Sequence, residues 1–117
     1  MSEEILLWGK SKASCVLPDV YYRKLIKICD KKGIVALSRC IQDIVVWFMK
    51  RVEEKGGLTA PLNYPVQKPT TKIQVKVYTE DYYNFQKVCE KIGYKKPSNC
   101  LRDTIILWLK EGVSNGS

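Results

Sequence analysis

Polar and apolar residues alternate over two short segments of the chain, 12–17 and 72–77. The apolar positions of the second segment are Ile73, Val75 and Val77. An extended strand points successive side chains to opposite faces, so this period of two predicts a strand with one buried and one polar face. We therefore expect one strand over 12–17 and another over 72–77.

A helical pattern follows each predicted strand. Apolar residues recur at helical spacing as far as Gly33 in the first case and Gly93 in the second, and glycine is the residue type that ends helices in a left-handed conformation. A second apolar stripe then begins after Ser38 and after Ser98, which we predict to be N-caps. Each region therefore predicts the order strand, helix, helix.

The two regions are copies of one unit. A shift of 60 positions aligns residues 12–50 with 72–110 without a gap, with ten identities in 39 positions. Between the copies, the segment 52–71 contains a Gly-Gly pair and three prolines at every fourth position, which predicts a semi-extended linker. A lone strand exposes its hydrogen-bonding groups, so each predicted strand needs a partner, and the obvious partner is the strand of the other copy.

These patterns divide the chain into an N-terminal apolar extension over 1–11, a first motif over 12–51, a linker over 52–71, a second motif over 72–111 and a tail over 112–117. The expected fold class is mainly α with a short two-stranded antiparallel ribbon. A linker of about 20 residues reaches up to roughly 60 Å when extended. The two motifs could therefore pair within one chain or between chains.

Composition adds a strong positive charge to this picture. The 117 residues include 20 Lys+Arg against 12 Asp+Glu, a formal net charge of +8, while 45% apolar residues are typical of a globular protein. Such a positive balance favours nucleic acid as a partner. The longest apolar runs, Ile44–Met49 and Ile105–Leu109, are far below the roughly 18–20 residues of a membrane span, and the first residues lack the charge pattern of a secretory signal. We therefore expect a protein inside a cell, with no membrane partner.

The types of reactive residue exclude several classes of site. The chain has no histidine, which excludes the usual zinc patterns and histidine-based hydrolase triads, and its five cysteines contain no CxxC pair. We expect no enzyme activity, no metal, no cofactor and no small-molecule substrate. We interpret the cysteines as small core residues, while a disulfide stays open because intracellular proteins of hyperthermophiles are an exception to the usual rule.

The segments 13–19 and 37–41, with the helical run between them, resemble a ribbon-helix-helix DNA-binding motif, and 73–77 with 98–101 resemble a second copy. The second copy departs at positions 78–79, where it has Tyr-Thr instead of Pro-Asp. The tandem arrangement is similar to that of transcription regulators of filamentous archaeal viruses, which implies the host cytoplasm as the location. The resemblance implies two ribbon-helix-helix motifs in one chain, forming a pseudo-dimer whose antiparallel ribbon enters the major groove of DNA.

The resemblance also implies which residues contact DNA. The outward ribbon residues that would read bases are Lys12, Ser14, Val16, Lys72, Gln74 and Lys76. Pairing about a pseudo-twofold axis would set Ser14 beside Gln74, Lys12 near Lys76 and Val16 near Lys72. Glutamine suits adenine, lysine suits guanine or phosphate, and valine suits the thymine methyl group. The residues that would bind phosphate, at or just before the start of each second helix, are Ser38, Arg39, Ser98, Asn99, Lys95 and Lys96.

The leading hypothesis is a sequence-specific transcription regulator that binds double-stranded DNA. Apolar residues cover more than one face of the second helices, so either the N-terminal segment Ile5–Trp8 covers them or a homo-oligomer forms through them. One alternative is an architectural protein that coats DNA with weak sequence preference. A second alternative is an antitoxin, although the tail 112–117 is short for wrapping around a partner. The simplest alternative for the polar residues themselves is a solvated strand face and plain helix caps.

Overall fold

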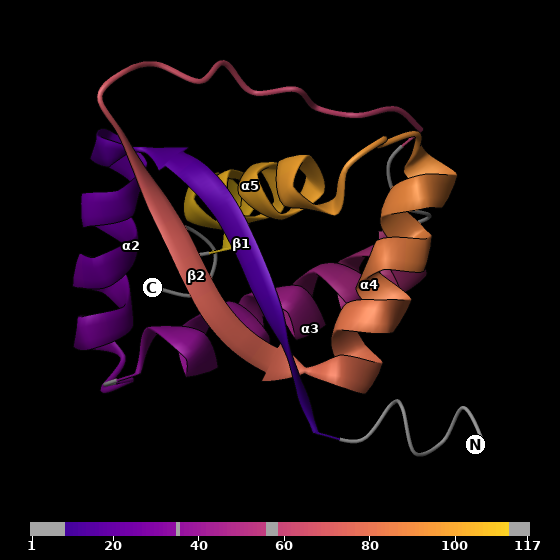
Figure 1. Cartoon of the computed structure of the whole chain (residues 1–117), viewed down its shortest axis with the longest axis horizontal. Helices are drawn as coiled ribbons and strands as arrows, with labels where there is room; N and C mark the ends of the chain where they lie inside the picture. The colour runs from indigo at the N-terminus through magenta and orange to yellow at the C-terminus, as the bar shows by residue number, and fades with distance from the viewer. Residues whose placement is uncertain (1–8, 35, 56–58, 113–117) are drawn as a thin grey trace.

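The structure is a computed structural model of the chain and describes residues 9–34, 36–55 and 59–112 (Figure 1). Its elements are, in chain order, β1 (Lys10–Pro18), α2 (Asp19–Lys31), α3 (Leu37–Lys55), β2 (Thr70–Tyr78), α4 (Thr79–Ile92), α5 (Pro97–Leu107) and a π-helical turn (Trp108–Gly112). Residues 1–8 of the predicted N-terminal extension and 113–117 of the predicted tail lie outside the described residues.

β1 and β2 form one antiparallel two-stranded sheet, called the ribbon below. Ser14 pairs with Gln74 at its centre, Lys12 with Lys76 on one side and Val16 with Lys72 on the other. The predicted register is therefore confirmed, and in this structure the two strands pair within one chain. Each strand is nine residues long and extends beyond the predicted segment at both ends.

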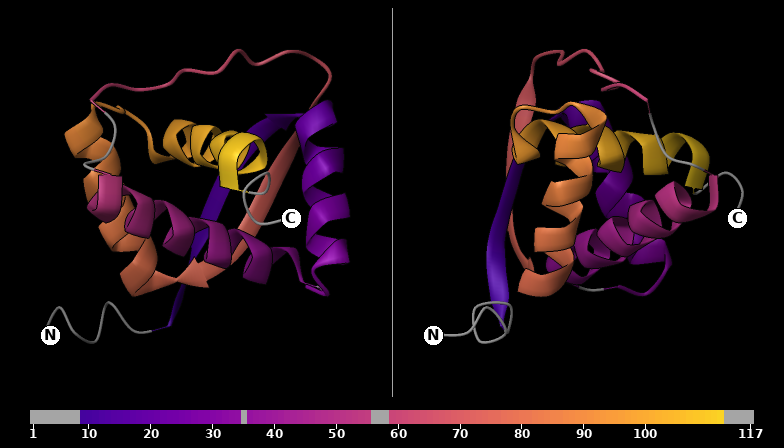
Figure 2. Two further views of the ribbon diagram at one scale, coloured as in Figure 1. Left: turned by 180° about the vertical axis from the view of Figure 1, so that it is seen from behind. Right: turned by 90° about the vertical axis from the view of Figure 1, so that its right-hand side faces the viewer.

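All four α-helices lie behind one face of the ribbon (Figures 1 and 2). The inner face carries six buried side chains, Ala13, Cys15, Leu17, Ile73, Val75 and Val77. These residues pack into one core with the buried stripes of α3 and α5 and with Phe85 of α4, whose ring lies 5.7 Å from that of Phe48 in an edge-on arrangement. Burial of one strand face is the alternation that the sequence predicted, and it leaves the opposite face open.

The prediction of two ribbon-helix-helix motifs that form a pseudo-dimer is wrong as a description of this fold. The described residues form one two-stranded sheet and four α-helices around a single core, so within them neither half has a sheet or a core of its own. The halves also differ in their last helix, because α3 runs for 19 residues whereas α5 ends after 11 and gives way to a π-helical turn. The physical reason is that a single strand per half finds its only ladder partner about 60 residues away.

The interpretation of the cysteines as small core residues is confirmed, since all five are buried in the core, and four of them form the disulfides that the sequence left open. Cys29–Cys40 and Cys89–Cys100 are disulfides with Cα atoms 6.1 and 6.0 Å apart. The first joins α2 to α3 and the second joins α4 to α5, in both cases across the turn between the helices. The sequence carries a signal for this pairing, since both copies have two cysteines separated by 11 positions. Cys15 is free and buried.

Of the predicted linker 52–71, residues 52–55 belong to α3 and 70–71 to β2. The described residues between them, 59–69, contain neither helix nor strand and are held against α5 by one carboxylate. Asp103 of α5 is buried, with 1% of its surface exposed, and accepts hydrogen bonds from the backbone N–H groups of Asn63 (2.8 Å) and Tyr64 (3.2 Å). The hydroxyl of Tyr94 donates to the same carboxylate at 2.7 Å and accepts from the N–H of Leu62 at 3.0 Å. The linker, which joins α3 to β2, is therefore docked onto α5 and the turn before it.

Candidate nucleic-acid interface

The exposed side of the ribbon, called the outer face below, contains all six residues predicted to read bases. Five of them are exposed and Ser14 is half-buried. The structure adds two residues that the prediction missed, Lys10 and Tyr78, which pair across the strands with the lysine Nζ 5.4 Å from the ring centroid. Continuing the alternation of polar residues by one step, back to Lys10 and forward to Tyr78, would have found both.

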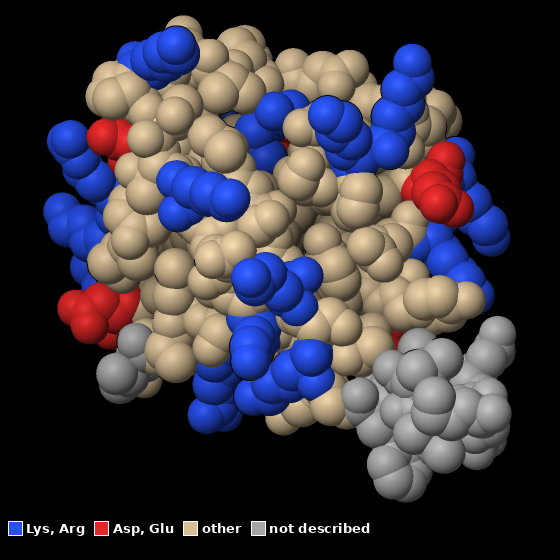
Figure 3. Space-filling model, viewed as in Figure 1, with Lys and Arg blue, Asp and Glu red and all other residues tan. Residues whose placement is uncertain are grey.

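The outer face is positively charged. Neither strand, over 10–18 or 70–78, contains an Asp or Glu, and all four of their lysines lie on the outer face. The space-filling view shows Lys and Arg side chains along the ribbon, and the acidic residues visible there lie towards the edges of the molecule (Figure 3). A two-stranded ribbon with one exposed face is narrow enough to enter the major groove of DNA.

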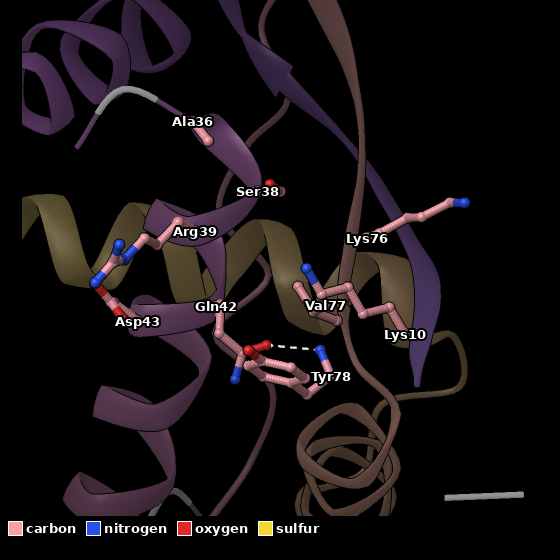
Figure 4. Close-up of a pocket in the computed structure, with 9 residues that line it drawn as sticks. All are labelled: Lys10, Ala36, Ser38, Arg39, Gln42, Asp43, Lys76, Val77 and Tyr78. Atoms are coloured by element: carbon pink, nitrogen blue, oxygen red, sulfur yellow. Dashed lines mark hydrogen bonds between the residues drawn. The ribbon is translucent and has the colours of Figure 1, made fainter. Parts of the chain in front are cut away.

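A groove of about 610 Å³ lies between this ribbon and the start of α3 (Figure 4). Its lining includes Ser38 and Arg39, two residues predicted to bind phosphate, together with Lys10 and Lys76 of the ribbon. Figure 4 shows Lys76 extending outward, away from the helix. The structure therefore brings the predicted phosphate-binding residues of the first half beside the outer face.

One glutamine fixes the distance between α3 and the ribbon at this groove. The side-chain oxygen of Gln42 accepts a hydrogen bond from the backbone N–H of Tyr78 at 2.8 Å, and its amide nitrogen donates to the carboxylate of Asp81. Gln42 is 8% exposed, so these bonds are largely shielded from water. The end of β2 and the first turn of α4 are therefore held against the second turn of α3, which makes the groove a defined feature of the fold.

A second, smaller groove of about 230 Å³ lies between the ribbon and the start of α5. Ser98 and Asn99 line it with Lys72, and so does Arg102, which sequence reasoning missed. The guanidinium group of Arg102 lies against Asp103, with Nε and Nη2 each 3.2 Å from the same carboxylate oxygen, and its side chain is 13% exposed. Arg102 occupies the position in the repeat that Gln42 holds in the first half, and no pattern in the sequence singled it out.

The structure corrects the role predicted for the two serines. Ser38 and Ser98 are the second residues of α3 and α5, not their N-caps, because the helices begin at Leu37 and Pro97. The N-cap of α5 is Lys96, with no side-chain capping bond. A proline is well suited to the first helical position, so Pro97 sets the start two residues earlier than predicted.

The two lysines before α5 are not part of either groove. Lys95 and Lys96 are exposed, but neither lines the groove beside the ribbon, and Lys95 lies instead next to Gln86 and Glu90 of α4. Of the six predicted phosphate-binding residues, the structure therefore brings four to the ribbon and leaves these two apart from it.

Cys15 is the one free thiol, and its surroundings make it a poor nucleophile. Burial on the inner face raises its pKa to about 12, although the charge of Arg102 opposes the shift. A thiol with this pKa is protonated at neutral pH, whereas the reactive form of cysteine is the thiolate. Among the residues that the structure describes, no group of three or more potential ligands could hold a metal ion.

Some of the extra apolar residues of the second helices are buried within the chain itself. Ile106 and Leu107 of α5 are buried in the chain's own core, whereas Val46, Trp47 and Met49 of α3 are only half-buried. Homo-oligomer formation through these helices stays a prediction. None of the described helices combines the length and apolar character that crossing a bilayer requires.

Comparison with known proteins gives no match: no family model, no curated protein and no solved structure is similar to this chain.

Proposed function

We propose that this protein binds double-stranded DNA with the outer face of its ribbon and reads base edges in the major groove, as a sequence-specific transcription regulator. The observation that supports this most is the outer face itself, where four lysines and Gln74 stand on a rigid two-stranded scaffold without any acidic residue. Lysine and glutamine are among the side chains that bond base edges, and the lysines also attract the phosphate backbone.

The two grooves give the ribbon places for the DNA backbone on both sides. Arg39 lines the groove beside α3, and Lys72 and Arg102 line the groove beside α5. A ribbon inserted into the major groove has a phosphate strand on each side, so cations at both flanks would position it. A DNA target implies that the protein acts inside a cell. The two disulfides are compatible with this location in a hyperthermophile, whose intracellular proteins contain disulfides.

Selection of bound sequences from a random DNA pool, followed by fluorescence anisotropy, tests this proposal. We expect the selected site to be preferred over random DNA by about a thousandfold or more. Gln74→Ala should weaken binding to the selected site by about 1–3 kcal/mol and relax one base position, with a smaller effect on random DNA. Gln67→Ala is the matched control, because Gln67 is an exposed glutamine in the linker.

An architectural protein gives a different outcome in the same experiment. Such a protein would recover no consensus from the pool, and Gln74→Ala would affect selected and random DNA equally. Failure to bind any DNA at low salt would contradict both forms of the proposal.

A further inference from the structure

The two ends of the outer face differ in chemistry, although the strands are paired symmetrically. The centre of the register is the Ser14–Gln74 pair. Towards one end lie Lys12 opposite Lys76 and then Lys10 opposite Tyr78, which we call the lysine end. Towards the other end lies Val16 opposite Lys72, called the valine end, beyond which the register closes with Pro18, which is buried, opposite the half-buried Thr70.

The difference is large in charge and in side-chain type. The lysine end carries three of the four lysines of the ribbon and an aromatic ring that is 55% exposed, whereas the valine end carries one lysine and Val16, 41% exposed. Figure 3 shows this contrast as a concentration of basic side chains over one end of the ribbon, the end at which β1 begins and β2 finishes in Figure 1.

The two grooves that flank the ribbon also differ between the lysine end and the valine end. The groove beside the lysine end has a volume of about 610 Å³, and the groove beside the valine end about 230 Å³. Gln42 fixes the wall of the first, while the repeat-equivalent Arg102, paired with Asp103, lines the second. The lysine end and the valine end therefore present different surfaces to a molecule that binds along the ribbon.

We infer that the chain recognises a non-palindromic DNA site in a single orientation, with the lysine end over a guanine-containing half and the valine end over a half that contains thymine. This inference rests on the proposed function and names its substrate more closely. Lysine bonds the O6 and N7 acceptors of guanine, and an aliphatic side chain contacts the thymine methyl group. Two symmetric half-sites would leave one end of the outer face against the wrong bases.

The repeat supplies a test through substitutions that make the ribbon more symmetric. Position 16 of β1 corresponds to position 76 of β2, and position 12 corresponds to position 72. Val16→Lys therefore gives the valine end the lysine pair of the other end. Lys76→Val does the reverse and gives the lysine end the valine and lysine of the other. Both positions are exposed, so neither change alters the core.

The experiment uses the full, disulfide-bonded chain and three DNA duplexes: the site selected from a random pool, and two palindromes, each built from two copies of one half of that site. The wild-type protein should select a non-palindromic site and bind each palindrome roughly tenfold or more weakly than this site. Val16→Lys should gain about tenfold for the palindrome of guanine-containing halves relative to the selected site. Lys76→Val should gain similarly for the other palindrome.

Val20→Lys is the control, because Val20 of α2 is 72% exposed and lies outside the ribbon. This variant adds the same charge as Val16→Lys, and it should strengthen binding to all three duplexes alike. A palindromic selected site, or equal responses of Val16→Lys and Val20→Lys, would overturn the inference while leaving DNA binding intact. Absence of a consensus from the pool, or of any DNA binding, would instead overturn the proposed function and this inference with it.

Discussion

Lys12 and Lys76 stand directly opposite each other in the antiparallel ribbon, and both side chains are exposed on its outer face. Like charges at directly opposed positions destabilise a sheet by a fraction of a kcal/mol up to about 1 kcal/mol. The ribbon keeps this repulsive pair on its exposed face, next to the central outward pair Ser14–Gln74. A nearby anion, such as a DNA phosphate or the electronegative edge of guanine, would relieve the repulsion.

Replacing Lys12 with Gln should therefore have opposite effects on folding and on DNA binding. The free energy of unfolding should rise by about 0.2–1 kcal/mol, because the repulsion is lost. Affinity for DNA should fall, and the slope of log affinity against log salt should decrease by about one, because one cation no longer displaces a counterion. Urea titration and anisotropy at several salt concentrations measure the two quantities.

Lys50→Gln is the matched control for this pair of effects. Lys50 is exposed on α3, and this end of the helix points away from the ribbon (Figure 2). The control should change neither the stability nor the salt slope by a comparable amount. A loss of stability in Lys12→Gln, or an unchanged salt slope, would contradict the role given to the pair.

The ribbon shows how far the sequence could predict this molecule. Strict alternation at Ile73, Val75 and Val77, with the repeat at 60 positions, predicted the strands, their register and the outer face, because a period of two leaves only one arrangement that buries the apolar set. The ends of the strands were missed. The prediction assigned Lys10 to the N-terminal extension over 1–11 and ended the second strand at Val77, one residue before Tyr78. The repeat also suggested two equivalent motifs, whereas the structure has one shared sheet and core.

The parts that escaped prediction depend on contacts between residues far apart in the sequence. Arg102 reaches its groove because Asp103 holds its guanidinium group, and Asp103 is buried because the linker crosses over it. No local sequence pattern indicates either the Arg102–Asp103 contact or the burial of Asp103. The repeat in fact aligns Asp103 with Asp43, which is exposed, so identical residues in the two copies have different environments.

The two disulfides should contribute strongly to stability. Each closes a loop with a sequence separation of 11 between helices that already pack together. Loss of loop entropy in the unfolded chain predicts about 3 kcal/mol for a loop of this size. The double substitution Cys29→Ala with Cys40→Ala, and likewise Cys89→Ala with Cys100→Ala, should each lower the free energy of unfolding by about this amount.

Urea denaturation with and without a reducing agent measures this contribution. The wild-type protein should lose stability on reduction, whereas a variant that lacks all four of these cysteines should not respond. An equal response of that variant, or no effect of reduction on the wild type, would show that the bonds do not support the fold.

Cys15 should be almost inert in the folded protein. Burial raises its pKa from the ordinary value of 9.0 to about 12. At pH 8 the thiolate fraction is then about a thousandfold lower than for an ordinary cysteine, so alkylation should slow by at least this factor. Mass spectrometry should find no rapid label on the native chain, one label after unfolding without reductant, and five after unfolding with reductant. Two or more labels without reductant would contradict the disulfide assignment.

The same shift predicts a pH dependence with a definite sign. The folded state binds the Cys15 proton more tightly than the unfolded state, so its contribution to stability is fully present below pH 9 and is lost as the pH rises towards about 12. Cys15→Ala should remove this part of the alkaline destabilisation. Stability curves for wild type and variant that run parallel between pH 8.5 and pH 11 would contradict the burial of this thiol.

Asp103 should be the most sensitive polar position in the chain. Its carboxylate accepts hydrogen bonds from two linker N–H groups and from Tyr94, and it contacts Arg102. The pKa of Tyr94 is raised by burial and by the hydrogen bond that the Tyr94 hydroxyl donates to Asp103. In Asp103→Asn, one acceptor oxygen becomes an amide donor, which leaves one of the two linker N–H groups without its acceptor and Arg102 without its counter-charge. We expect the free energy of unfolding to fall by about 3 kcal/mol or more.

The repeat provides the control for this prediction. Asp43 is the equivalent residue of the first copy and is exposed, so Asp43→Asn should change stability by no more than about 0.5 kcal/mol. Urea titrations of the two variants compare the same chemical change in a buried and an exposed setting.

Because Asp103 also holds Arg102 in the smaller groove, Asp103→Asn should weaken DNA binding more through the valine end than through the lysine end. The two palindromic duplexes separate these contributions, and equal losses on both would limit the role of Asp103 to stability.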